Sequence, residues 1–176
     1  MGDGSGDFQI SWHTYFGKYF SSASILDVGA GIGKSKQRLQ YNLNNVTTQD
    51  INPDRKGLVD ILQPIEEITT KFDYVVSFDV IEHVDDQYKF LIEKKRLSTI
   101  GVLDTTPNWY LYPRDWHFTS SQFYELYLGM FGDSYRYSYF FRIKTSDRDY
   151  VEETTQQSFL DDKTKYAYGI LAVVNE

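Results

Sequence analysis

The sequence predicts an α/β fold in which helices flank a mostly parallel sheet that ends in an antiparallel hairpin. Short apolar runs alternate with segments of helical spacing as far as about residue 131. Two strands rich in Tyr and Phe, 134–145 and 165–175, then follow each other across a polar stretch. The run FDYVVSFDVI at 72–81 is continuously apolar, which is typical of a strand buried on both faces.

The remaining elements follow from periodicity and from turn residues. Helices are expected at 8–20, 34–43, 63–71, 85–97 and 119–131, and further strands at 24–28, 46–51, 57–62 and 99–106. Thr119 and Gln122 have the spacing of a capping box at the start of the last helix. Only one turn fits between Pro53 and Leu58, and we expect loops at 107–116 and 146–163. Residues 93–96 are expected to form a solvated helix end.

The composition limits which kinds of protein and which kinds of site are possible. A length of 176 residues suggests one domain spanning 1–176, with the Gly-rich residues 1–6 disordered. The absence of cysteine excludes disulfides, thiolate catalysis and Cys-based zinc sites. The net charge of −7 argues against a broad phosphate-binding surface. No apolar run is long enough to span a membrane, and the N-terminus lacks the features of a signal peptide, so we expect a cytoplasmic protein without a membrane partner. Nothing in the sequence fixes the oligomeric state.

A glycine-rich turn follows the first strand. Gly29, Gly31 and Gly33 come between a strand and a helix, where glycine lets the backbone turn tightly and approach a ligand. Asp50 ends the second strand about 20 residues later, the spacing of a carboxylate that binds a ribose. The loop lacks the ending of a phosphate-binding P-loop and fits a dinucleotide fingerprint poorly. A tight connection without any ligand remains the alternative.

An acidic and histidine-containing cluster follows the strand at 72–81. Asp79, Glu82 and His83 have the i, i+3, i+4 spacing of one helix face, and His117 comes from the loop after the neighbouring strand. Both positions fall at the carboxyl end of a parallel sheet, where such sheets bind ligands. Two carboxylates and two imidazoles suit a divalent metal or general base catalysis. The alternative is a helix start, favoured by Asp85 and Asp86, with no ligand at all.

These motifs together resemble class I S-adenosylmethionine-dependent methyltransferases over residues 24–128, through DVGAGIG, Asp50, Asp60-Ile61 and FDYVVSFDVIEHV. The resemblance implies a Rossmann-like, seven-stranded, mostly parallel sheet with an antiparallel last strand. It implies that Asp27, Gly29, Ala30 and Gly31 hold the methionine end of S-adenosylmethionine. It further implies that Asp50 binds the ribose, Ile51 packs on the adenine, Asp60 and Ile61 meet the adenine edge and face, and Ser77 and Phe78 line the cofactor.

Two subfamilies are similar in the second cluster. One comprises the ubiquinone-type small-molecule O-methyltransferases, and the other the small-RNA 3′-terminal 2′-O-methyltransferases. Similarity to the second implies that Asp79, Glu82, His83 and His117 hold Mg²⁺ or Mn²⁺. This sequence departs from that family at Asp79, where Glu is usual, and from the wider family in lacking a helix after Asn52.

Three hypotheses of function follow. The first is a methyltransferase that O-methylates a small molecule, with His83 or His117 as the catalytic base. The second has RNA as the acceptor and a divalent metal at the site; the acidic composition counts against it. The third is a cofactor-binding module without catalysis.

Overall fold

The structure is a computed structural model that describes residues 12–17, 20, 22–32, 45–109, 117–146 and 149–175. The predicted helix at 34–43, the tail at 1–6 and residues 110–116 of the predicted loop lie outside the described residues. Of the helix predicted at 8–20, residues 12–17 and Phe20 are described; residues 12–17 are helical, and Phe20 lies in a turn. No described helix is both long enough and apolar enough to cross a bilayer.

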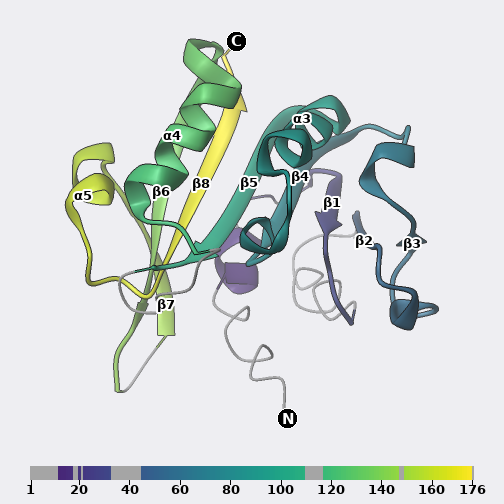
Figure 1. Ribbon diagram of the computed structural model, residues 1–176, viewed down its shortest axis with the longest axis horizontal. Coiled ribbons are helices and arrows are strands. Elements are labelled where there is room, and N and C mark those ends of the chain that lie inside the picture. The colour runs from purple at the N-terminus through teal and green to yellow at the C-terminus, as the bar shows by residue number, and fades with distance from the viewer. Residues whose placement is uncertain are drawn as a thin grey trace.

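Eight strands form one sheet in the order β3-β2-β1-β4-β5-β8-β6-β7 (Figure 1). Their bounds are β1 Ile25–Val28, β2 Val46–Asp50, β3 Ile61–Leu62, β4 Phe72–Phe78, β5 Ser98–Pro107, β6 Tyr135–Lys144, β7 Asp149–Thr154 and β8 Ala167–Val174. The first five strands are parallel, and β8 is antiparallel to both β5 and β6. The predicted parallel sheet and its antiparallel terminal hairpin are therefore confirmed.

The segment 146–163 differs from its prediction as a loop. It contains β7, which pairs antiparallel with β6, and the short helix α5, Gln156–Asp161. The sheet consequently has eight strands instead of the seven that the resemblance implies. The sequence DYVEET of β7 gave no alternating apolar signal because this edge strand buries none of its side chains fully.

Local signals place the two main helices as predicted. Asp86 caps α3, Gln87–Leu97, by accepting a hydrogen bond from the Lys89 N–H at 2.9 Å. Thr119 and Gln122 form the predicted capping box at the start of α4, Ser120–Phe131.

The connections around β3 are abbreviated. Between β2 and β3 the only helical turn is η1, Pro53–Arg55, so no full helix forms there, as the sequence predicts. The helix expected at 63–71 is reduced to another such turn, η2, Ile65–Glu67. Ile65 and Ile68 are both buried, and their spacing of three residues suits one 3₁₀ turn instead of a continuing α-helix.

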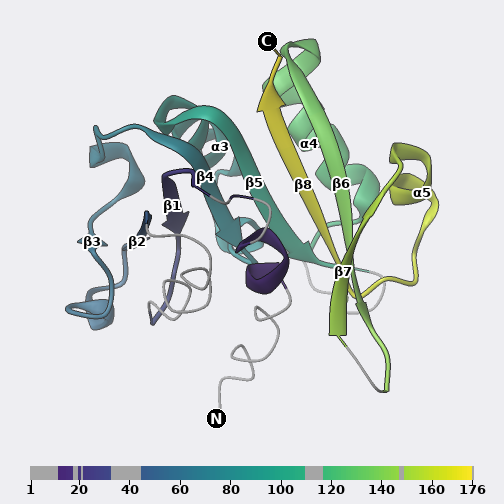
Figure 2. The ribbon, with the colours of Figure 1, turned by 180° about the vertical axis from the view of Figure 1, so that it is seen from behind.

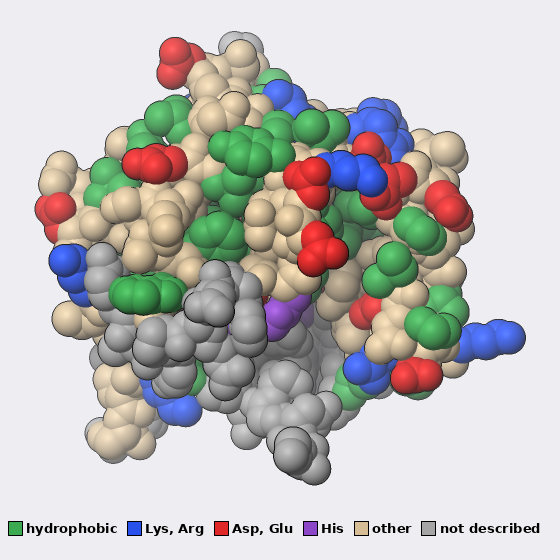
Figure 3. All heavy atoms as spheres, in the orientation of Figure 1, with side chains coloured by type: hydrophobic (Ala, Val, Ile, Leu, Met, Phe, Trp, Pro, Cys, Tyr) green, Lys and Arg blue, Asp and Glu red, His purple; other side chains and the backbone are tan. Residues whose placement is uncertain are grey.

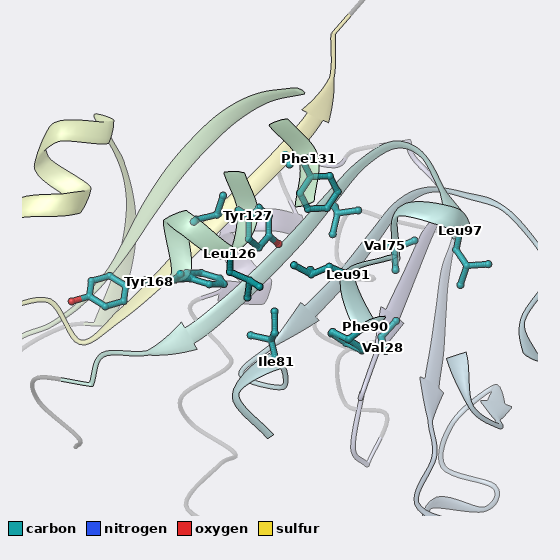
Figure 4. Close-up of a cluster of buried hydrophobic side chains, with 14 of the residues drawn as sticks. Val28, Val75, Ile81, Phe90, Leu91, Leu97, Leu126, Tyr127, Phe131 and Tyr168 are labelled. Carbon is teal, nitrogen blue, oxygen red and sulfur yellow. The ribbon is translucent and has the colours of Figure 1, made fainter. Parts of the chain in front are cut away.

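Each face of the sheet carries its own core. Figure 4 shows residues of α3, α4 and the strands packed together on one face, among them Phe90, Leu91, Tyr127 and Tyr168. The helix at 12–17 lies on the opposite face, which Figure 2 shows in front of the sheet. Its Trp12 and Phe16 pack there with strand residues of the second core. Neighbouring residues such as Val75 and Val76 of β4 belong to opposite cores, as the two-residue period of a strand requires.

Candidate active site

The glycine turn follows β1 directly, at the carboxyl end of the sheet. Gly29 and Gly31 have φ angles of +71° and +62°, which other residues rarely adopt. A Cβ on Gly29 would also lie 2.8 Å from both Cγ atoms of Val80, whereas a Cβ on Gly31 would meet nothing within 4 Å. Two features therefore require glycine at position 29: the positive φ of its backbone and the close approach of the loop after β4.

Two residues at the end of β2 hold this turn. Asp50 Oδ2 accepts a hydrogen bond from the Gly31 N–H at 2.9 Å, and Oδ1 accepts one from the Asn52 N–H at 2.8 Å. Gln49 Oε1 accepts from the Gly29 N–H at 3.3 Å, and Gln49 Nε2 donates to the Gln63 carbonyl. From the sequence Asp50 was expected to bind a ribose, and its hydrogen bond to the glycine turn was not foreseen. The role of Gln49 was missed as well, and its position beside Asp50 was the only signal.

A cavity of about 400 Å³ opens beside the turn, within the range of roughly 300–1,000 Å³ common for small-molecule sites. Its walls come from the turn, the end of β2, η2, the loop after β4 and the start of α3. They are mostly apolar, with polar groups at the rim; the lining residues are Val28, Gly29, Gln49, Asp50, Ile51, Ile65, Glu66, Val80, Val84, Asp85, Asp86, Lys89 and Phe90. Figure 3 shows acidic and basic side chains gathered beside a hollow, right of centre, on this face.

The cavity includes some of the predicted cofactor residues and not others. Gly29, Asp50 and Ile51 line it. Asp27 is buried at the end of β1, beside Thr48 of β2. Asp60 and Ile61 are not among the lining residues. The Asp60 carboxylate accepts hydrogen bonds from the backbone N–H and the hydroxyl of Thr48, both at 2.9 Å, and Ile61 packs against the core of the α3 face.

Ser77 and Phe78 end β4 without lining the cavity, and they face opposite sides of the sheet. The Ser77 hydroxyl lies in a buried polar network with Lys94 and Asp104. Phe78 packs on the ring of His13, with 4.3 Å between ring centroids. The two-residue period of the strand explains the separation, because adjacent side chains cannot share a face.

The buried network joins α3, β4, β5 and α4. Lys94 is fully buried and donates to the Leu103 carbonyl at 2.8 Å, to the Ser77 hydroxyl at 3.2 Å and to the Asp104 carboxylate. The second oxygen of Asp104 accepts from the Tyr127 hydroxyl. Burial lowers the pKa of Lys94 and raises the pKa of Tyr127 well above its ordinary value, the latter with help from the Asp104 charge. The prediction of a solvated helix end is wrong for Lys94, because this residue lies on the inner face of α3.

The predicted acidic and histidine cluster lies in the loop after β4, around the turn η3, Ile81–His83. Asp79 has a φ of +56°, and its Oδ1 accepts a hydrogen bond from the Thr105 hydroxyl at 2.9 Å. Glu82 is buried, and its Oε2 has no hydrogen-bond partner among the described residues. Burial, followed by the negative charge of Asp79, raises the pKa of Glu82 well above its ordinary value.

The two histidines occupy different positions. The His83 side chain is 61% exposed, and its Nε2 lies 3.9 Å from Glu82 Oε1. His117 is half-buried and precedes Phe118, which forms a bridge with Asn108. Within the described parts of the chain, which include all four predicted ligands, no three His, Asp or Glu residues are gathered to hold a metal ion. The residues as arranged therefore do not fit the metal site that the resemblance implies.

A glycine turn, a carboxylate ending the second strand and a cavity at the carboxyl edge of a parallel sheet define an α/β protein that binds a nucleoside-type cofactor. The family model described as "Methyltransferase domain" matches residues 10–98. The chain belongs to this family, and it is an S-adenosylmethionine-dependent methyltransferase with the class I, Rossmann-like fold that the sequence predicted.

Solved structures share this fold. One is an S-adenosylmethionine-dependent methyltransferase from Thermotoga maritima, a possible histamine N-methyltransferase; it is 15% identical with a TM-score of 0.70, covering 94% of this chain and 89% of that one. The magnesium protoporphyrin IX methyltransferase of Synechocystis PCC 6803, with bound S-adenosylmethionine, is 14% identical with a TM-score of 0.64, covering 94% and 76%. The methyltransferase domain of a bacterial Hen1 protein is 15% identical with a TM-score of 0.65, covering 95% and 98%. At these identities the likeness concerns the fold. The comparison with curated proteins finds no match.

Proposed function

We propose that this methyltransferase transfers the methyl group of S-adenosylmethionine to an oxygen atom of a small-molecule acceptor in the cytoplasm. The observation that carries the proposal is the continuity of the loop after β4. Val80 and Val84 line the cavity beside the glycine turn, and they flank the turn η3 that carries Glu82 and His83. The short loop after β4 therefore places one wall of the cofactor cavity next to Glu82 and His83, two side chains that can accept or donate a proton.

The cofactor fits the residues around the cavity. The backbone at Gly29, Ala30 and Gly31 and the Asp27 carboxylate would hold the methionine part. Each Asp50 oxygen already accepts one N–H and retains capacity for one ribose hydroxyl. Ile51 is 67% exposed and lies on the cavity wall, where it would pack on the adenine. Bound S-adenosylmethionine supplies an electrophilic methyl group on its sulfonium.

The residues of the second cluster would orient the acceptor and take its proton. The exposed imidazole of His83 can accept a hydroxyl proton near neutral pH. Glu82, whose pKa is raised by burial, would be protonated over more of the pH range than an exposed acid and could donate a hydrogen bond to the acceptor. His117 is the alternative base.

RNA is the second candidate acceptor. The order of Asp79, Glu82, His83 and His117 favours it, as does the overlap with the bacterial Hen1 domain across nearly all of both chains. A bound Mg²⁺ or Mn²⁺ would require these four side chains to move together, so we derive no step through a metal.

The test begins with calorimetry of S-adenosylhomocysteine, because absence of binding would remove both acceptor hypotheses. Methyl transfer is then measured to a panel of phenols and hydroxy acids and to an RNA with a free 3′ end, each with Mg²⁺, with Mn²⁺ and with EDTA. We expect an O-methylated small molecule, identified by NMR, at a rate that EDTA does not change. Methylation of RNA alone, abolished by EDTA, would contradict the proposal. Cofactor binding without transfer to any acceptor would favour the non-catalytic module.

The variants His83→Gln and His117→Gln identify the base. Loss of a general base slows transfer by about 10²–10⁴-fold. We expect that loss for His83→Gln, with unchanged cofactor affinity, and a small effect for His117→Gln. The reverse result would assign the base to His117.

A further inference from the structure

One wall of the cavity has little regular structure of its own. Ile65 and Glu66 line the cavity from the turn η2, where the sequence predicted a longer helix. Inside this turn the Glu67 N–H donates to the Pro64 carbonyl at 3.1 Å, and the Ile68 N–H donates to the Ile65 carbonyl at 3.2 Å. A helix of one turn leaves most of its carbonyl groups without partners inside the helix. This wall therefore depends on hydrogen bonds from other elements.

Arg96, near the end of α3, supplies such hydrogen bonds. Its guanidinium donates from Nη1 to the Ile68 carbonyl at 2.8 Å, and from Nη2 to the Ile65 carbonyl at 3.2 Å and the Glu66 carbonyl at 3.4 Å. Its Nε donates to Glu93 Oε2 at 2.6 Å, which fixes the plane of the guanidinium. The planar fork of arginine donors suits several acceptors at once. Arg96 itself is not among the residues that line the cavity.

The other polar contacts of this wall are fewer or more exposed. At the start of the segment, the Gln63 carbonyl accepts a hydrogen bond from Gln49 Nε2, which ties it to the end of β2. At the rim of the cavity, Glu66 forms an ion pair with Lys89 of α3, with 2.9 Å between Oε1 and Nζ. Both of these side chains are exposed, and exposed ion pairs contribute little. Among the described residues, Arg96 therefore supplies the main polar link between η2 and α3.

We propose that Arg96 is a positioning residue for S-adenosylmethionine, because it holds the carbonyl groups of η2 and so keeps the Ile65 wall of the cavity ready for the cofactor. The inference rests on the proposed function, since it requires this cavity to hold the cofactor. A wall that is ordered before binding does not have to be ordered by the ligand, and the affinity is higher by that difference. Arg96 acts through η2 and does not contact the ligand.

The experiment compares Arg96→Met with the wild-type chain by calorimetry of S-adenosylhomocysteine. Methionine keeps much of the apolar stem of the side chain and removes every hydrogen-bond donor. Binding must then order the η2 turn, so we expect about tenfold weaker affinity, which corresponds to fixing about one more residue. Arg96→Lys keeps the charge and loses the planar fork, so it should lose part of this affinity, and it serves as the test if Arg96→Met does not fold.

Hydrogen exchange separates this local role from a general loss of stability. In the ligand-free protein, the amides of Glu67 and Ile68 should exchange faster in Arg96→Met than in the wild-type chain, beyond any change at the buried strand β4. Saturating S-adenosylhomocysteine should slow the same amides again. Exchange in η2 that the substitution leaves unchanged relative to β4 would overturn the inference.

Lys95→Met is the matched control, because it removes the same charge from the neighbouring position of α3. Lys95 Nζ donates to the Met130 carbonyl at 3.4 Å, so this side chain contacts α4 instead of η2. Lys95→Met should therefore retain the affinity of the wild type. Unchanged affinity in Arg96→Met would overturn the inference, as would an equal loss in Lys95→Met. If the wild-type chain binds no S-adenosylhomocysteine, the proposed function fails; if it binds and Arg96→Met binds equally well, only the inference fails.

Discussion

The ammonium group of Lys94 is buried against the carboxylate of Asp104, and every hydrogen-bonding direction of the ammonium is used within the core. Removing one partner of a buried ion pair is strongly destabilising, because the remaining partner is left as an uncompensated charge away from water. We expect Lys94→Met to lower the free energy of unfolding by about 3–5 kcal/mol, measured by urea denaturation.

The double variant Lys94→Met/Asp104→Asn is the control for this pair. The neutral amide can accept from one of the Ser77 and Tyr127 hydroxyls through its oxygen and donate to the other through its NH2 group, so much of the lost stability should return. A single variant as stable as the wild-type chain would contradict the buried pair.

Glu82 gives the protein a predictable dependence of stability on pH. Its pKa in the folded state is raised above the ordinary value of 4.5, so its favourable contribution is complete below pH 4.5 and is lost as the pH rises through the folded-state pKa. Glu82→Gln, which resembles the protonated acid, should therefore be more stable than the wild type at pH 8, by about 1 kcal/mol. The difference should vanish at pH 4, as urea denaturation at the two pH values would show. Greater stability of the wild type at pH 8 would contradict the burial of this charge.

Substituting alanine for the two glycines of the turn, Gly29 and Gly31, should reduce the stability of the protein by different amounts. Gly31→Ala meets no neighbouring atom and should cost only the left-handed backbone strain, about 1–2 kcal/mol. Gly29→Ala adds a clash with Val80, so it should be more destabilising and should weaken S-adenosylhomocysteine binding further. Adding Val80→Ala should recover part of the stability of Gly29→Ala and none of that of Gly31→Ala. Equal thermal stability of the two single variants would argue against the close approach to Val80.

Asp50 serves the turn and, in our proposal, the ribose. Asp50→Ala should weaken binding of S-adenosylhomocysteine by tenfold or more, because two backbone N–H groups and two hydroxyls lose an acceptor. Asp54→Ala removes the same charge from the exposed turn η1 and should leave affinity unchanged. Calorimetry on both variants checks the expectation, and equal affinities would remove Asp50 from the site.

Local patterns in the sequence were enough for most of the fold. The capping box at Thr119, the helix start marked by Asp86 and the apolar run of β4 each depend on residues close together in the chain, and each is confirmed. The glycine turn and Asp50 were found for the same reason, since their spacing follows from one strand–turn–helix–strand unit.

What the sequence could not predict depends on contacts between distant residues. The register of β3 against β2 decides whether Asp60 faces the cavity or Thr48. The hydrogen bond between Thr48 and Asp60 joins two strands, so it cannot be recognised from the hydrophobic pattern of either strand. Lys94 has the appearance of a surface residue because its partner, Asp104, comes from another element.

The abbreviated connections around β3 also bear on how copies of the chain meet. A sheet can grow at its edges by pairing backbone groups with another molecule, which leads to aggregation. At one edge, β3 offers only the two residues Ile61 and Leu62. At the other, β7 exposes the charged Glu152 and Glu153, which would repel the same strand of a second copy. The trimmed strand at one end and the acidic strand at the other therefore keep an open eight-stranded sheet from extending itself.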